Sequence, residues 1–198
     1  SEASQILENA IAFYERNNRP VYPVLHYYLG YCYNKLDEHS KMYEQFTSGS
    51  KACSKYVFPY NRYSLRILEN AVAKLNEDAT GWMYLGNLYA YYRRHHEAID
   101  AWEKSLALKP GNSMVLHNLA GATWYLNQDT LKTLHYLEKA LEHDKGDKRL
   151  IMELDHLYQA FQMPFKRDDL FKRYEQVITD FDELVMRYTR FCLENKEF

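Results

Sequence analysis

The chain has 198 residues and a formal net charge of −2 at pH 7, from 25 Lys and Arg against 27 Asp and Glu. This near balance excludes a general attraction to nucleic acid or to an anionic membrane. The length is enough for one domain with a substantial core, and the 19 tyrosines suit either packed helix pairs or a binding groove.

The first 78 residues show helical periodicity in an irregular order. Residues 5 to 17 predict an amphipathic helix. A second helix carries four regularly spaced residues, namely His26, Leu29, Gly30 and Tyr33. A long helix is expected from about Glu38 to Tyr56, after which Phe58-Pro59-Tyr60 breaks the pattern and residues 63 to 75 predict another helix.

Residues 79 to 112 carry the most informative pattern in the chain. Positions are counted from Ala79 as position 1. The first half of the pattern has Trp82 at 4, Leu85 and Gly86 at 7 and 8, and Tyr89 at 11. The second half has Ala98 at 20, Trp102 at 24 and Pro110 at 32. This pattern resembles the tetratricopeptide repeat (TPR) over its whole 34-residue period.

The resemblance implies two antiparallel helices, helix A over about residues 79 to 92 and helix B over about residues 95 to 108. Glycine at position 8 indicates that helix B crosses close to Gly86, and Ala98 is expected to face it for the same steric reason. The segment from Lys109 to Asn112 then predicts the end of helix B, because Pro110 cannot continue a helix and Gly-Asn suits a turn.

The same register divides the rest of the chain into irregular repeats over 5–78, degenerate repeats over 113–147 and 148–181, and a truncated repeat over 182–198. One inserted residue near Asn127-Gln128-Asp129 keeps the first degenerate repeat in register. Asp155 stands at position 8 of the next one, so tight helix contact is in doubt there. In 5–78 the A–B alternation fails: either the long helix is kinked around Ser48-Gly49-Ser50, or an atypical repeat is inserted.

The resemblance therefore implies a single all-α domain over residues 1–198, with about 10 or 11 antiparallel helices stacked in a right-handed TPR superhelix, an α-solenoid. Residues 195 to 198 resemble the turn that precedes a helix B. We therefore expect a fragment that stops in mid-repeat. Its last helix, without its natural partner, is expected to favour a homodimer.

In TPR arrays, positions 2, 5, 9, 12 and 13 of helix A line the concave face, which implies a groove for a peptide or a partner helix. The candidate groove residues are Tyr27, Tyr31, Met83, Asn87, Tyr91, His117, Asn118, Trp124, Arg149 and His156. TPR modules that clamp the carboxylate of chaperone tails need Lys where this chain has Met83 and Arg where it has Glu153. We therefore predict a non-catalytic interaction or scaffolding module that lacks this clamp.

A second, broader resemblance covers most of the chain from about Tyr22. Its order of segments is similar to the TPR region of large bacterial proteins that begin with a β-rich domain of unassigned function: His26 to Tyr31, Val57 to Arg62, Tyr84 to Tyr89, Glu97-Ala98-Ile99 with Trp102-Glu103, and Glu153 to Tyr158. This implies, as an alternative, an accessory or oligomerisation domain of a carbohydrate-related protein, with another domain of the same polypeptide as partner. A third alternative is direct binding of a glycan or small ligand in a Tyr-rich groove.

Other chemistry has little support in the sequence. Cys32, Cys53 and Cys192 suit free thiols in a reducing, cytoplasmic compartment, not a disulfide framework or a zinc site. No cofactor, metal or catalytic site is expected, although His117 and His156 can make a pH-sensitive contact across the groove. No apolar run approaches the roughly 20 residues that span a bilayer, and the chain does not start with a signal peptide.

Overall fold

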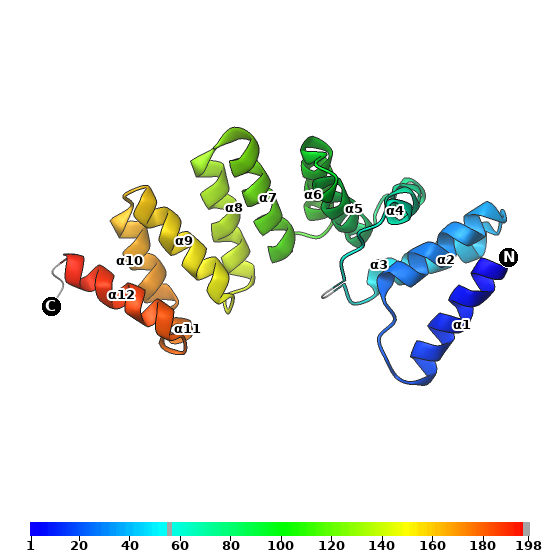
Figure 1. Cartoon of the computed structure of the whole chain (residues 1–198), viewed down its shortest axis with the longest axis horizontal. Coiled ribbons are helices and arrows are strands. Elements are labelled where there is room, and N and C mark those ends of the chain that lie inside the picture. Colours follow the sequence, from blue (N-terminus) through cyan, green and yellow to red (C-terminus); the bar gives the residue numbers. More distant parts are fainter. Residues whose placement is uncertain (55–56, 196–198) are drawn as a thin grey trace. The chain divides into compact units, whose positions relative to one another are not determined.

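The computed structural model describes residues 1–54 and 57–195, which contain twelve helices and no strand (Figure 1). In chain order the helices are α1 (Glu2–Arg16), α2 (Pro23–Lys35), α3 (His39–Lys51), α4 (Arg62–Lys74), α5 (Ala79–Tyr91), α6 (His95–Leu108), α7 (Ser113–Asn127), α8 (Thr130–His143), α9 (Lys148–Ala160), α10 (Pro164–Arg173), α11 (Glu175–Thr179) and α12 (Asp182–Asn195). The all-α prediction is confirmed. The helices form two compact units, an N-terminal unit over residues 1–110 and a C-terminal unit over residues 111–198.

Two regular A–B pairs form the centre of the N-terminal unit, α2 with α3 and α5 with α6. In each pair a glycine of helix A leaves room for an aromatic ring of helix B. A Cβ at Gly30 would overlap the ring of Phe46, and a Cβ at Gly86 would overlap the ring of Trp102. We predicted Ala98 opposite Gly86, but the atoms nearest to that glycine belong to Trp102.

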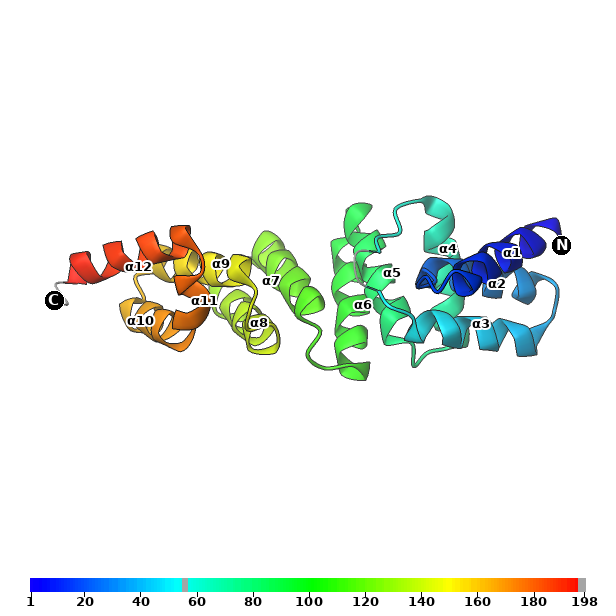
Figure 2. The same cartoon turned by 90° about the horizontal axis from the view of Figure 1, so that it is seen from below.

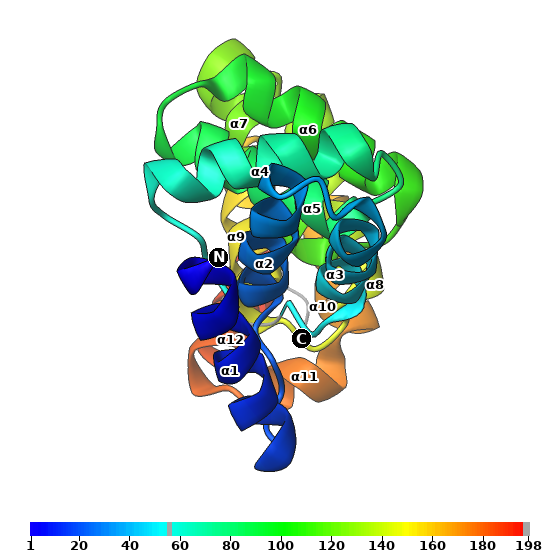
Figure 3. The same ribbon diagram turned by 90° about the vertical axis from the view of Figure 1, so that its right-hand side faces the viewer.

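The irregular order of the N-terminal unit comes from one additional helix, α4. The predicted long helix is wrong in its length: α3 ends at Lys51, and residues 55 and 56 lie outside the described part of the chain. The segment before Arg62 then leads into α4, which packs on both α2 and α5. Helix α4 is seen end-on in Figure 1 and from its side in Figure 3, where it crosses α2.

The C-terminal unit continues the pairing, with α7 against α8 and α9 against α10. Within this unit, Figure 2 shows α9 and α12 in one layer and α8 and α10 in the other. The second half of the predicted repeat 148–181 is divided at Tyr174 into α10 and α11, which is one reason why the helices outnumber the predicted 10 or 11. The last helix expected in the segment 182–198 is α12, and residues 196–198 of the predicted terminal turn lie outside the described residues.

The turn between helices A and B repeats along the chain. A residue in the left-handed region follows helix A at position 15 of three repeats, namely Asp37, Arg93 and Gln162, with φ between 54° and 61°. In the repeat that starts at Ser113 the corresponding residue is Gln128, with φ 51° at position 16. This shift by one position agrees with the predicted insertion near Asn127.

In the α9–α10 pair an ion pair stands at positions 8 and 20, where the repeat at 79–112 has the small residues Gly86 and Ala98. Asp155 is fully buried at position 8, and its Oδ1 accepts from Nε of Arg167, at position 20, over 2.5 Å. The other oxygen, Oδ2, lies 3.2 Å from Nη1 of Arg187 on α12. The guanidinium of Arg167 also lies over the rings of Phe171 and Phe191, at 5.6 and 4.9 Å from their centroids. Asp155, which takes the place of the small residue expected at position 8, therefore links α9, α10 and α12.

The glycine contact predicts a position-specific effect on stability. Gly86→Ala should lower the free energy of unfolding by about 1–3 kcal/mol, because the added methyl group overlaps Trp102 in a packed core. The control Gly121→Ala adds the same group to α7, where no atom lies within 4 Å, and should gain up to about 1 kcal/mol of helix propensity. Urea unfolding measured by circular dichroism compares the two, and equal effects would contradict the close approach.

The buried carboxylate predicts a second effect. Asp155→Asn should lower the free energy of unfolding by about 3–5 kcal/mol, because Arg167 stays buried without its closest counter-charge. As a control, Asp169→Asn breaks an exposed pair with Arg173 one helical turn away, at 2.6 Å, and should cost less than about 1 kcal/mol. If both variants unfold at the same urea concentration, Asp155 does not hold the unit together.

Candidate functional site

The C-terminal unit exposes an aromatic and polar surface along α7 and α9, which we call the α7–α9 face. Nε2 of His117 lies 2.9 Å from Oε2 of Glu153. Two turns further along α7, the ring of Trp124 meets the ring of Phe161 edge-on, with centroids 5.9 Å apart. Between these two contacts, Gly121 leaves open space beside α7. The α7–α9 face therefore has a polar end, an aromatic end and room between them.

The carboxylate of Glu153 controls the charge of His117. Its hydrogen bond raises the pKa of His117, burial opposes this shift, and the charge of Glu153 adds to it. The sequence suggested His156 as the residue opposite His117, but Glu153 is the residue that bonds it. Protonated His117 therefore forms an ion pair on the exposed α7–α9 face.

The other predicted residues of this unit have different surroundings. Trp124 is 40% exposed and its neighbour Tyr125 is 71% exposed. His156 is also exposed, whereas Asn118 is half-buried. The guanidinium of Arg149 is exposed and pairs over 3.0 Å with Asp147, the residue that caps its own helix. Arg149 therefore already has a counter-charge from its own turn.

In the N-terminal unit, two predicted groove residues lie in the core. Tyr27 is fully buried because Gly49 of α3 leaves room for its ring and its hydroxyl donates a hydrogen bond to Asp78 over 2.7 Å. Met83, the equivalent residue of α5, is only 3% exposed. The prediction that these two side chains line a groove is wrong, because both are enclosed by the packing of their own unit.

The remaining predicted residues of this unit are accessible to different degrees. Tyr91 is 65% exposed, and its ring packs edge-on against Tyr92 at 5.1 Å. Tyr31 is half-buried, with the ammonium of Lys35 over its ring at 5.4 Å. Asn87 is half-buried, and its Oδ1 accepts a hydrogen bond from the indole N–H of Trp102 over 2.9 Å. Its amide oxygen is therefore part of the helix pairing.

Helix α4 covers part of the helix A surface in the N-terminal unit. Asn34, which the sequence register places in line with Tyr31, donates to Asn70 of α4 over 3.2 Å. On the other side of α4, the hydroxyl of Tyr89 on α5 donates to Glu69 over 3.0 Å. The first of these bonds occupies Asn34, which stands at a groove position of the repeat, and the second ties α4 to α5.

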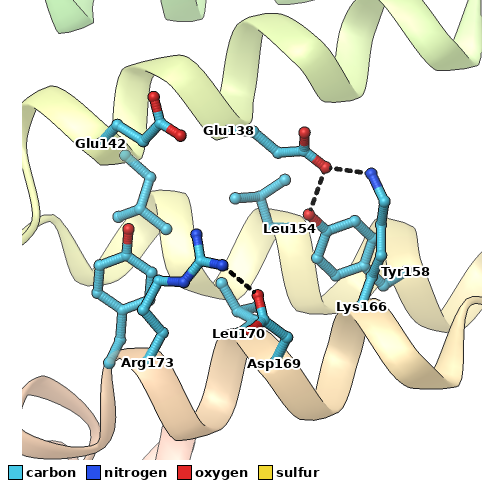
Figure 4. Close-up of a pocket in the computed structure, with 10 residues that line it drawn as sticks. Glu138, Glu142, Leu154, Tyr158, Lys166, Asp169, Leu170 and Arg173 are labelled. Atoms are coloured by element: carbon cyan, nitrogen blue, oxygen red, sulfur yellow. Dashed lines mark hydrogen bonds and ion pairs between the residues drawn. The ribbon is translucent and has the colours of Figure 1, made fainter.

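A cleft of about 200 Å³ lies in the C-terminal unit between α8, α9 and α10 (Figure 4). The side chains of Leu141, Leu154 and Leu170 form its apolar part. Its charged and phenolic groups are Glu138, Glu142, Tyr158, Lys166, Asp169, Arg173 and Tyr174. Sequence reasoning missed this cleft because its residues come from three helices and show no local motif.

Hydrogen bonds order one end of the cleft. Oε1 of Glu138 accepts from the hydroxyl of Tyr158 over 2.7 Å and from Nζ of Lys166 over 2.6 Å, as Figure 4 shows. Burial is the main reason that the pKa of Tyr158 is raised, and the bond to Glu138 adds to the shift. Tyr158 therefore stays a neutral hydrogen-bond donor at physiological pH.

Two further kinds of site have no basis in the described residues. No three His, Cys, Asp or Glu side chains among them are arranged to hold a metal ion. Within the same residues, no helix has the length and apolar composition needed to cross a bilayer.

Comparison with known proteins identifies the fold. The family model "Tetratricopeptide repeat" matches residues 79–112, and no curated protein is significantly similar to the chain. The crystal structure of YrrB, described as a TPR protein with an unusual peptide-binding site, is 15% identical, with a TM-score of 0.55 over 98% of this chain and 86% of that one. PilF of Pseudomonas aeruginosa is 14% identical, with a TM-score of 0.54 over 98% and 85%.

A third structure, the RS-1 ArsTM double mutant of MamA, is 11% identical, with a TM-score of 0.55 over 92% of this chain and 98% of that one. Identities this low establish the fold alone. Together with the matched repeat, they show that the chain contains a tetratricopeptide repeat at residues 79–112 and has the fold of TPR solenoid proteins.

The pair on the α7–α9 face predicts a measurable titration. The pKa of His117 should lie above the ordinary value of 6.5 and fall toward it in Glu153→Gln, because the bond to Glu153 is the main cause of the shift. Since folding raises this pKa, the pair stabilises the fold fully below pH 6.5, and the contribution is lost as the pH rises through the raised value. NMR titration of the imidazole measures this. An unchanged pKa in Glu153→Gln would disprove the assignment.

Proposed function

We propose that this chain is a non-catalytic protein-interaction module that binds a peptide or a partner helix on the α7–α9 face. The observation that carries the proposal is Trp124, which is 40% exposed although Phe161 fixes its ring from one side. A large aromatic ring held in place and open to solvent is typical of the anchor positions of protein interfaces.

The physical argument rests on what a partner would cover. Burying the open side of Trp124 and the ring of Tyr125 removes aromatic surface from water at about 25 cal/mol per Å² before the costs of association. Because Phe161 already restricts the ring of Trp124, little rotamer freedom is lost on binding. The pair of His117 and Glu153 supplies polar contacts at the edge of this surface.

The charges of the face favour a ligand other than a free carboxylate. Arg149 already pairs with Asp147, and Glu153 would repel an anion. Met83, at the position where a carboxylate clamp needs Lys, is buried in the other unit. We therefore propose recognition through aromatic burial and backbone hydrogen bonds, which need no charge on the ligand.

The comparisons support an interaction role at the level of the fold. TPR domains are in general binding domains, and YrrB is described as having a peptide-binding site. The alternatives remain predictions: an accessory domain of a bacterial carbohydrate-related protein, and direct glycan binding. Homodimerisation through the last helix also remains a prediction, and α12 does expose Met186 and Leu193.

A library of displayed random peptides tests the proposal without a known partner. Peptides selected on the wild-type chain should lose affinity for Trp124→Ala by roughly thirtyfold, because truncating an anchor aromatic costs about 2 kcal/mol. The control Leu131→Ala removes a side chain of α8 that is 75% exposed, and it should bind as the wild type does. Circular dichroism should show equal helicity in the three proteins. Selected peptides that bind Trp124→Ala undiminished would refute the assignment.

A further inference from the structure

The cleft between α8, α9 and α10 contains one more acidic than basic group. Its carboxylates belong to Glu138, Glu142 and Asp169, and its cations to Lys166 and Arg173. Lys166 pairs with Glu138 over 2.6 Å, and Arg173 pairs with Asp169 over 2.6 Å. Two ion pairs therefore leave the charge of Glu142 unbalanced in the cleft.

Glu142 stands at the opposite end of the cleft from the bonded group of Tyr158 and Lys166 (Figure 4). Within the described residues, no hydrogen bond or ion pair to its carboxylate is present. It lies near Tyr174, whose pKa is raised mainly by burial; the charge of Arg173 and its hydrogen bond to the phenol oppose this shift, and the charge of Glu142 adds to it. An exposed carboxylate beside a phenol ring is a favourable place for an organic cation, which gains both from the charge and from the face of the ring.

The volume limits what can enter. A cleft of about 200 Å³ is smaller than the roughly 300–1,000 Å³ of pockets that hold drug-sized ligands. The seven non-hydrogen atoms of an arginine side chain match this size, and a whole helix does not. The leucine side chains of the cleft would pack against the aliphatic part of such a ligand while its charged end meets Glu142.

The neighbouring surface limits the charge of the ligand. An adjoining hollow beyond Tyr174 is lined by Lys145, Lys172 and Arg173 together with Glu175. Lys172 pairs with Asp168 over 2.7 Å and Arg173 pairs with Asp169 over 2.6 Å. The remaining Lys145 and Glu175 have opposite charges, so the hollow offers no net negative charge to a second cation. The cleft is therefore suited to a single basic residue.

We propose that this cleft receives one basic side chain of a protein partner, with Glu142 as the residue that binds its positive charge. The proposal rests on the proposed function, because it takes the cation to belong to a protein. It adds a second contact point, separate from the α7–α9 face, and predicts a single arginine or lysine as the recognised group.

The direct test uses blocked arginine, N-acetyl-arginine amide, as the probe of the intact chain, followed by NMR. It should shift the backbone amide signals of Glu142 and Tyr174 with a dissociation constant on the order of 1 mM. Blocked citrulline has the same shape without the charge and should leave these signals in place. Glu142→Gln should weaken blocked arginine about tenfold, because a charge-assisted hydrogen bond is lost.

The control Glu103→Gln removes an exposed carboxylate from α6 in the other unit and should bind the probe as the wild type does. Equal shifts with arginine and citrulline, unchanged affinity in Glu142→Gln, or no shift at all would each overturn the proposal. Because the probe needs no peptide and does not involve Trp124, a failure here leaves the α7–α9 face in place. A failure of the peptide selection likewise leaves this result standing.

Discussion

The close approach of helix A to helix B at position 8 of each repeat is the constraint on which the pairing depends. Two helices can approach closely only if one of them gives up side-chain volume where they cross. Gly30 and Gly86 do this, and the rings of Phe46 and Trp102 fill the space. The aromatic ring then contributes a large buried area to the pair, which no polar residue at the same position of helix B would supply.

The α9–α10 pair meets this constraint with charge instead of small volume. A buried carboxylate is tolerated only when its oxygens are bonded, and those of Asp155 receive Arg167 and Arg187. Because Arg167 and Phe171 face inward from α10, the residues Lys166 and Arg173 on its other side face the cleft. The ion pair thus orients the helix whose outer residues build the candidate binding site.

The 34-residue pattern predicts the local structure well because position 8, position 24 and the final proline all act within one helix pair. The helix predicted over residues 63 to 75 is present as α4, but nothing in a 34-residue window shows that this additional helix will pack against both α2 and α5. The pattern failed for Tyr27. That residue is at a groove position by spacing, but Gly49 and Asp78, both distant in sequence, enclose its ring and hydroxyl.

The two candidate surfaces of the C-terminal unit use different sides of α9. Glu153 is exposed and belongs to the α7–α9 face, whereas Leu154 and Tyr158 line the cleft. Asp155 directly follows Leu154 in sequence and is bonded by two arginines. Because α9 contributes to both surfaces, a partner that reaches both gains the second contact without a second loss of translational freedom. Two weak contacts, one at Trp124 of α7 and one at Glu142 of α8, can therefore give one specific interaction.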